Sequence, residues 1–188
     1  MPSLVPPVVP AGSWGPFPQP EIEGDGLLLR PWRPGDEPFL LGAYSDPAIQ
    51  HWHAFGMSKQ AEAEEFIARQ TRRWQQESGA DWMVSADGKP LGRVGLRTLD
   101  LPYGDGEVAY WVAPDARGNG IAARSASVLI DWARNAGMHR FSLTHSTQNV
   151  ASCRVATRCG FVLEGVAVRS QRHADGYHDM HLHALLLD

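Results

Sequence analysis

The chain has 188 residues and a formal net charge of −4, a length that suits one ordinary domain with its own core. Its charges are spread out, and the lack of a basic stripe argues against a nucleic acid or an anionic membrane surface as the partner. No apolar run is long enough to span a membrane, and the first residues lack the basic and apolar regions of a signal peptide.

The first segment, residues 1–24, is rich in proline and glycine. Proline fixes φ and removes a hydrogen-bond donor, so neither a helix nor a central strand suits this segment. We expect an irregular arm, either as a disordered leader or as an arm that wraps a partner subunit with Trp14 and Phe17 as anchors. Residues 25–188 are expected to form a single domain.

The next elements follow from hydrophobic periodicity. The apolar run over 27–32 predicts a strand, and residues 36–53 have helical spacing that is broken at Pro47. Residues 58–78 predict an amphipathic helix with Ser58 as its cap. The apolar face of that helix is formed by Ala63, Phe66, Ile67, Gln70 and Trp74.

The second half of the chain alternates short strands and helices. The expected elements are a hairpin turning at Asp87–Gly88, a strand over 106–113, a helix over 119–137, a strand over 140–146, a short helix over 149–160, and closing strands over 161–168 and 179–187. This order predicts a mixed α/β domain with a largely antiparallel sheet. A doubly wound dinucleotide fold would need steadier alternation and a GxGxxG after the first strand, and the sequence has neither.

A glycine-containing turn, "ARGNGIAA", lies between the strand over 106–113 and the helix that follows. A helix N-terminus offers unpaired N–H groups and a positive dipole end, which suit phosphate oxygens. Gly118 and Gly120 let the backbone approach such a ligand closely. No GxxxxGK[ST] motif occurs, so we expect a diphosphate held mainly by backbone, or else a plain connection.

Arg117, Gly120 and Ala122 fill the pattern [Arg/Gln]-x-x-Gly-x-[Gly/Ala], and the turn thereby resembles the acetyl-CoA pyrophosphate signature of the GNAT N-acetyltransferases. The segments "GEVAYWVAPDARGNGIA", "NVASCRVATRCGF" and "LLLRPWRPGDEPFL" are similar to the subgroup that acetylates ribosomal-protein N-termini. The resemblance covers about residues 26–188. It implies a mostly antiparallel seven-stranded sheet flanked by helices, a V-shaped split between the fourth and fifth strands, and a homodimer.

The resemblance also implies which residues contact acetyl-CoA. The backbone of Trp111 and Val112 would pair with the pantetheine amides, and Asn149 would contact the pantetheine arm. The complete set of expected contacts is Trp111, Val112, Arg117, Gly118, Asn119, Gly120, Ile121, Ala122, Asn149 and Ser152. From the residues alone, Arg117 could instead be a solvated turn arginine. Asn149 could be a helix cap, a role that is compatible with contacting CoA.

Two residues are the catalytic candidates. Glu107 stands in the strand "EVAYWV" with Ala109 and Trp111 on its face, an apolar setting that suits a general base. The resemblance implies that Glu107 acts on the amine through water. The alternative is a solvated carboxylate at a strand edge. The resemblance also implies that Ser152 donates a proton or a hydrogen bond to the CoA sulfur, and the lack of a tyrosine in its helix favours Ser152 for this role. The alternative is a capping serine.

The acceptor site and a metal site are less defined by the sequence. Tyr44, His51, Trp52 and Trp82 are candidates for substrate contact, with His53 beside them, although surface aromatic residues often only pack. The three histidines in "HDMHLH" are potential ligands for a metal ion. His181 and His183 share one strand face and His178 takes the other, so a third nearby ligand is not expected and no metal is predicted.

The two cysteines, Cys153 and Cys159, fit no CxxC metal or redox pattern, and a reducing, cytoplasmic setting is the default. The function that the resemblance implies is direct acetyl transfer from acetyl-CoA to a primary amine. The acceptor is either a protein N-terminal amine, as the subgroup implies, or a small amine such as a polyamine, an amino acid or an antibiotic. A non-catalytic acyl-CoA-binding module and a nucleotide-binding module are the alternatives.

Overall fold

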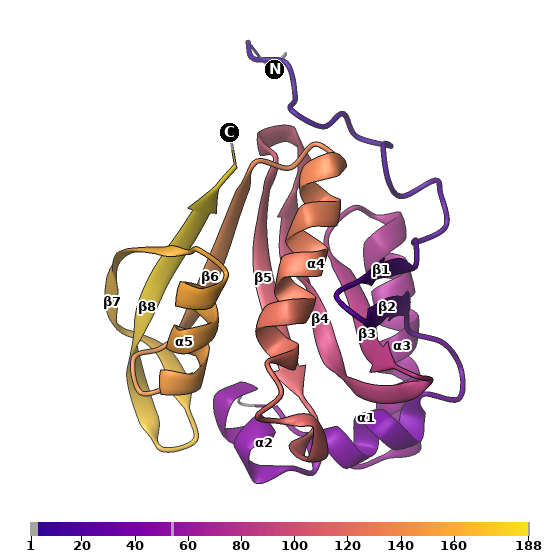
Figure 1. Ribbon diagram of the computed structural model, residues 1–188, viewed down its shortest axis with the longest axis vertical. Helices are drawn as coiled ribbons and strands as arrows, with labels where there is room; N and C mark the ends of the chain where they lie inside the picture. Colours follow the sequence, from indigo (N-terminus) through magenta and orange to yellow (C-terminus); the bar gives the residue numbers. More distant parts are fainter. Residues whose placement is uncertain (1–3, 54, 188) are drawn as a thin grey trace.

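The computed structural model describes residues 4–53 and 55–187, and within them a single sheet has the strand order β1-β2-β3-β4-β5-β6-β8-β7 (Figure 1). The strands are β1 (Ile22–Gly24), β2 (Leu27–Pro31), β3 (Ala80–Ala86), β4 (Lys89–Asp100), β5 (Asp105–Val112), β6 (Arg140–Ser146), β7 (Val162–His173) and β8 (Gly176–Leu186). The helices are α1 (Glu37–Tyr44), α2 (Pro47–His53), α3 (Gln60–Gln75), α4 (Ile121–Asn135) and α5 (Val150–Arg158), with short 3-10 turns at Leu101–Tyr103 and Pro114–Ala116.

The sheet has eight strands rather than the expected seven. The additional strand, β1, lies in the segment that was expected to be irregular, and it pairs antiparallel with β2 across a tight turn. The hairpin between β3 and β4 turns at Asp87–Gly88 as predicted, with positive φ at both residues.

Strands β5 and β6 are the parallel neighbours in this sheet, and every other pair is antiparallel. Their pairing is confined to three residue pairs, from Asp105 with Arg140 to Glu107 with Ser142. Beyond Glu107 the two strands diverge (Figure 1). The predicted V-shaped split is therefore confirmed, and it leaves the β6-facing backbone edge of residues 108–112 without a strand partner on that side.

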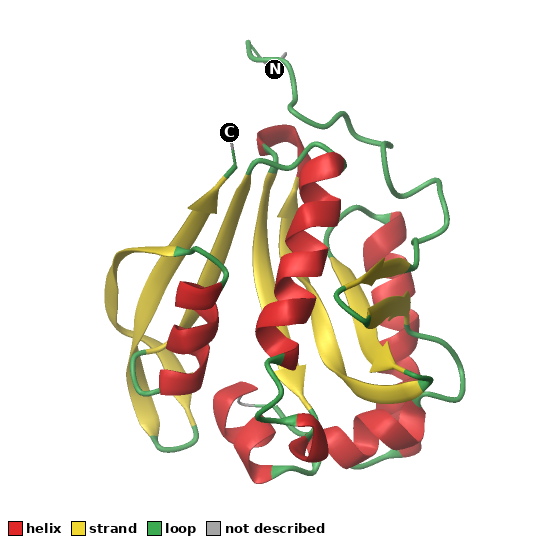
Figure 2. Cartoon of the chain, in the orientation of Figure 1, coloured by secondary structure: helices red, strands yellow, loops and turns green. Residues whose placement is uncertain are grey.

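Helices cover both faces of the sheet (Figure 2). Helix α4 packs on β1, β2, β4 and β5, and Leu129 and Phe141 lie fully buried in the core on its side. On the other face α1 and α3 enclose a second cluster that includes Phe66, Met83 and Trp111. No helix in the described part of the chain has the length and apolar character to cross a membrane.

Helix α3 has the predicted buried face, because all five expected residues are inaccessible. Its predicted cap is wrong. Ser58 lies outside the helix, Lys59 is the N-cap, and the Glu62 carboxylate accepts hydrogen bonds from the backbone N–H groups of Ser58 and Lys59 at 2.8 and 3.0 Å. The glutamate at the third helical position thus satisfies the two backbone N–H groups that immediately precede the helix, as the glutamate of a capping box does.

The closing hairpin is longer than predicted. Strand β7 continues to His173 and β8 begins at Gly176, whereas the expected strands ended at 168 and began at 179. The polar composition of the intervening residues resembles a loop, but the pairing continues through a bulge near Arg169, whose φ is 48°.

The N-terminal arm packs on its own chain. Trp14 is only 6% exposed, and its ring centroid lies 5.8 Å from that of Trp74 and 5.0 Å from that of Trp132. The Glu77 carboxylate accepts hydrogen bonds from three backbone N–H groups of the arm. Phe17 is 62% exposed. Of the two expected anchors, the Trp14 ring therefore anchors the arm to the core of the same chain, whereas the Phe17 ring is exposed and only its backbone carbonyl, which accepts from Trp74 Nε1 at 2.7 Å, contacts that core.

Candidate active site

A cleft of about 690 Å³ opens where β5 and β6 diverge. Eleven of the fifteen residues expected from the sequence line it: Trp52, Glu107, Trp111, Val112, Arg117, Gly118, Gly120, Ile121, Ala122, Asn149 and Ser152. The candidate base Glu107 lies on β5, the candidate acid Ser152 lies on α5, and the Gly118–Gly120 turn follows β5. The fold therefore brings all three to one cleft.

The glycine turn lines the cleft through Gly118 and Gly120. Gly118 and Gly120 have φ values of 82° and 69°, which L side chains rarely adopt, and Gly120 is the N-cap of α4. Asn119 does not line the cleft. Its side-chain amide donates to the carbonyls of Ala116 and Arg117 at 3.3 Å, so Asn119 maintains the shape of the turn.

Arginines surround this turn. A Cβ built on Gly120 would lie 3.4 Å from the Arg158 guanidinium, and Arg154 and Arg158, one helical turn apart on α5, both line the cleft. Arg117 donates to the Asp46 carboxylate at 2.6 Å, and this contact lowers the pKa of Asp46. Arg154 and Arg158 were not predicted from the sequence, although their i, i+4 spacing on α5 is a signal that points to them.

Glu107 lies near the apex of the V, at the last residue pair between β5 and β6. Its side chain is 13% exposed and accepts hydrogen bonds from Arg97, at 3.0 Å from Nε and also from Nη2. The carboxylate was expected in an apolar setting. The structure instead gives it a charged partner, Arg97, which fixes the orientation of both carboxylate oxygens.

Ser152 lies in the first turn of α5. The Asn149 side chain caps this helix by accepting from the Ser152 backbone N–H at 3.0 Å, so the capping role of Asn149 is confirmed. The Tyr110 side chain on β5 lies next to the Ser152 hydroxyl, and burial raises the pKa of Tyr110 to about 12. Its buried hydroxyl lacks a well-directed hydrogen bond among the described residues. Tyr110 was missed because the search for a tyrosine was confined to the helix of Ser152.

Trp52 and His53 of α2 also line the cleft, together with Arg97 and His173. Burial, together with the nearby cations Arg93 and Arg97, lowers the pKa of His53 to about 4, so this imidazole is neutral at pH 7. His51 does not line the cleft; its backbone carbonyl accepts from His173 Nδ1 at 3.0 Å.

The sequence of the chain matches a protein-family model, that of the acetyltransferase (GNAT) domain, over residues 26–162, which is most of the chain. The chain belongs to the GNAT acetyltransferase family. The ribosomal-protein-serine acetyltransferase of Escherichia coli (strain K12) is 27% identical over 108 residues, which are 57% of this chain and 60% of that protein. The chain thus matches less than two thirds of that relative's length. An uncharacterised N-acetyltransferase of Bacillus subtilis (strain 168), YoaA, is 26% identical over 78% of this chain and 85% of its own.

Solved structures share the fold of this GNAT chain. The RimL ribosomal-protein alpha-N-acetyltransferase in complex with coenzyme A superposes with a TM-score of 0.82 at 22% identity, covering 90% of this chain and 99% of that one. The microcin self-immunity acetyltransferase MccE in complex with acetyl-CoA and AMP has a TM-score of 0.79 at 22% identity, covering 87% and 94%.

Two expected substrate contacts lie in the core of this GNAT domain instead of in the cleft wall. Tyr44 is 2% exposed, and its hydroxyl accepts from Trp111 Nε1 at 3.3 Å. Trp82 is fully buried and donates to the Pro20 carbonyl at 2.8 Å. Sequence position near the acceptor site did not reveal which aromatic residues face inward.

The histidines of the closing hairpin divide into two groups. His178 lies between Ser146 and Asp175, at 2.8 Å from the Ser146 hydroxyl and 2.9 Å from the Asp175 carboxylate. His181 and His183 take the opposite face, as predicted. The expectation that they lack further ligands is wrong, because His145 and Cys153 from other elements lie beside them.

Proposed function

We propose that this GNAT chain transfers an acetyl group from acetyl-CoA directly to a primary amine. The observation that carries the proposal is the cleft itself, which is lined by a backbone cradle with arginines and by Glu107 and Ser152 along the divergence of β5 and β6. The diphosphate of CoA would bind the N–H groups of the Gly118–Gly120 turn, with Arg158 beside it. The free edge of residues 108–112 would pair with the pantetheine amides.

In the reaction, the amine nitrogen attacks the thioester carbonyl carbon, a C–N bond forms, and the C–S bond then breaks. Glu107 accepts the ammonium proton through a water molecule, with Arg97 holding the carboxylate in place. The departing sulfur receives a proton or a hydrogen bond from the Ser152 side. Tyr110 stays protonated at neutral pH and lies beside Ser152, which makes its hydroxyl a second source of that proton.

The acceptor is proposed to be the α-amine of a protein N-terminus. The name of the Escherichia coli relative, a ribosomal-protein-serine acetyltransferase, supports this class of acceptor. The acceptor would reach Glu107 from the part of the cleft lined by Trp52 and His53. A small amine remains the alternative acceptor, because the aromatic and imidazole groups there do not themselves select a peptide.

The test is a panel of acceptors incubated with acetyl-CoA and followed by mass spectrometry. The panel holds peptides with a free α-amine, the same peptides with a blocked N-terminus and one internal lysine, a polyamine, free amino acids and an aminoglycoside. Addition of one acetyl group to the free α-amine alone supports the proposal. Acetylation confined to a small amine overturns the proposed acceptor, and tight acetyl-CoA binding without transfer to any acceptor favours a non-catalytic acyl-CoA-binding module.

The cytoplasmic location and the homodimer are also proposals. Strand β7 is an edge of the sheet, and it exposes apolar side chains that include Val162, Leu163 and Val168. A second copy of the chain packed against this edge would cover them. Light scattering of the purified chain tests this, and a monomer mass at high protein concentration would contradict it.

A further inference from the structure

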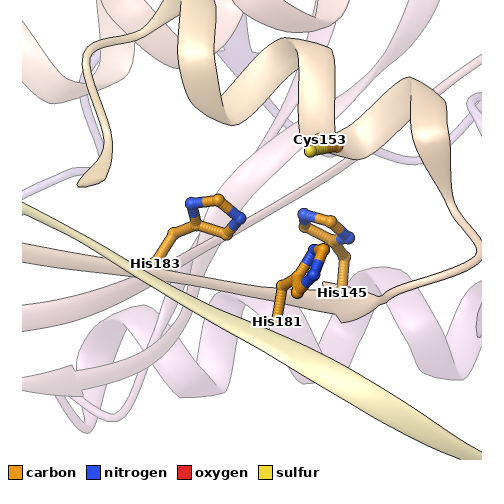
Figure 3. A group of neighbouring side chains, drawn as sticks. All are labelled: His145, Cys153, His181 and His183. Carbon is orange, nitrogen blue, oxygen red and sulfur yellow. The ribbon is translucent and has the colours of Figure 1, made fainter. Parts of the chain in front are cut away.

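Four potential ligands for a metal ion meet under α5 (Figure 3). His145 is on β6, His181 and His183 are on β8, and Cys153 is on α5 directly after Ser152. His145 and His181 are cross-strand partners, and His183 lies two residues farther along the same face of β8. One nitrogen from each imidazole and the Cys153 sulfur all lie within 4.8 Å of one another.

The imidazoles carry buried nitrogen atoms without hydrogen-bond partners among the described residues: Nε2 of His145, Nδ1 of His181 and both ring nitrogens of His183. His145 and His183 are each only 6% exposed. A buried polar atom without a partner costs roughly 1–3 kcal/mol, so native structures rarely retain one. Several such atoms in one cluster indicate that a shared partner belongs among them.

The tautomer of His145 supports the same conclusion. Its Nδ1 lies 2.8 Å from the Ser146 backbone carbonyl, which can only accept a hydrogen bond, so Nδ1 carries the proton. The Nε2 lone pair is therefore free and faces the cluster. A backbone carbonyl that fixes the ring in this way is the usual outer partner of a metal-bound histidine.

We propose that His145, Cys153, His181 and His183 bind one transition-metal ion, with Zn²⁺ as the best fit. Three imidazoles and a thiolate suit Zn²⁺ in a closed tetrahedral structural site, and the lack of a carboxylate in the set disfavours Ca²⁺ and Mg²⁺. Tetrahedral Zn²⁺ places its ligand atoms about 3.4 to 3.6 Å apart. Small side-chain rotations that draw the four groups together by about an ångström reach this geometry.

The ion would have a structural role. It would tie α5 to β6 and β8, which lie on the far side of the V, through a bond at Cys153. Ser152 is the neighbouring residue, so metal binding would also fix the side chain proposed to face the CoA sulfur. The proposal does not depend on the acetyl-transfer proposal, since the four ligands themselves hold the ion.

The first test is a titration of the full-length, chelator-treated chain with Co²⁺, followed by absorption spectroscopy. The expected result is one equivalent of Co²⁺ per chain, with a thiolate-to-cobalt charge-transfer band and the intense visible bands of tetrahedral cobalt, all displaced by Zn²⁺. Cys153→Ser should lose the charge-transfer band, and His183→Asn should weaken affinity at least tenfold. Cys159→Ser and His139→Asn, matched controls outside the cluster, should retain both the band and the affinity.

The second test needs no variant and so does not depend on how the variants fold. The wild-type chain is alkylated with and without Zn²⁺, and the modified cysteines are identified by mass spectrometry. Zn²⁺ should slow the alkylation of Cys153 at least tenfold and leave Cys159 unchanged. Cobalt bound without a thiolate band, Cys153→Ser binding like the wild type, or equal alkylation of Cys153 with and without Zn²⁺ would each overturn the proposal.

Discussion

The Arg97 guanidinium donates to both carboxylate oxygens of Glu107 at the residue where β5 and β6 part. The pair places a fixed anion at the apex of the V, next to the space where an acceptor amine would meet the thioester. Because the Arg97 side chain is half-exposed, the ion pair contributes little to the stability of the fold. Its main effect is to fix the orientation of the Glu107 carboxylate.

Glu107→Gln removes the proposed base and leaves the cradle intact. We expect kcat to fall by roughly 10²- to 10⁴-fold, while acetyl-CoA affinity stays within twofold of the wild type. Steady-state kinetics and calorimetry measure the two quantities. Glu164→Gln is the matched control, because this half-exposed carboxylate on β7 is also paired with an arginine. It should leave kcat and the acetyl-CoA affinity unchanged. Unchanged turnover of Glu107→Gln across a pH series would remove Glu107 from the mechanism.

Tyr110→Phe separates a catalytic hydroxyl from a structural one. The Tyr110 hydroxyl is buried and poorly partnered, so its removal should leave the free energy of unfolding unchanged or slightly raised. If it supplies the proton to sulfur, kcat should still fall at least tenfold. Ser152→Ala and the double variant then form a cycle, and non-additive losses in kcat would show that the two hydroxyls act together. Full activity of the double variant would exclude both as the proton source.

Trp14 and Phe17 provide a matched pair in the N-terminal arm. Trp14→Ala removes a buried ring from between Trp74 and Trp132 and should lower the free energy of unfolding by about 3–5 kcal/mol. Phe17→Ala changes an exposed ring and should stay within about 0.5 kcal/mol of the wild type. Denaturant unfolding measures both. Equal effects of the two substitutions would contradict the packing of the arm on its own chain.

Because the pKa of His53 is lowered, we expect the folded chain to lose stability in mild acid. Its pKa is lowered from 6.5 to about 4 in the folded chain, chiefly by burial, so the unfolded chain binds the proton more readily. The contribution is fully present above pH 6.5 and is lost as the pH falls toward 4. His53→Gln should therefore melt with a smaller dependence on pH than the wild type over this window. Parallel melting curves at every pH would show that His53 does not experience this environment.

Local patterns predicted most of the elements, because the periodicity of α3, α4 and β6 and the Asp87–Gly88 turn are encoded in adjacent residues. The cap of α3 was mispredicted because the helix begins at Gln60, one residue later than a Ser58 cap requires, and Glu62 accepts from the N–H groups of Ser58 and Lys59. The eighth strand was missed because a tight turn can pair three residues that show no periodicity of their own.

The site could be predicted where its residues lie on one motif, as in the Gly118–Gly120 turn. It could not be predicted where residues from distant segments meet. Arg97 beside Glu107 and Tyr110 beside Ser152 are such pairs. The same limit applied to His145 and Cys153, which join two histidines of β8 only when α5 folds over the sheet.

The most direct test of the central claim is a calorimetric titration of acetyl-CoA into the purified chain, with ATP and NAD as controls. We expect saturable acetyl-CoA binding that is absent with NAD and ATP and is lost in Gly120→Glu. Binding should be weakened in Arg158→Ala but not in Arg72→Ala, a half-exposed position on α3. Equal binding of acetyl-CoA by the wild type and Gly120→Glu, or no binding by the wild type, would contradict it.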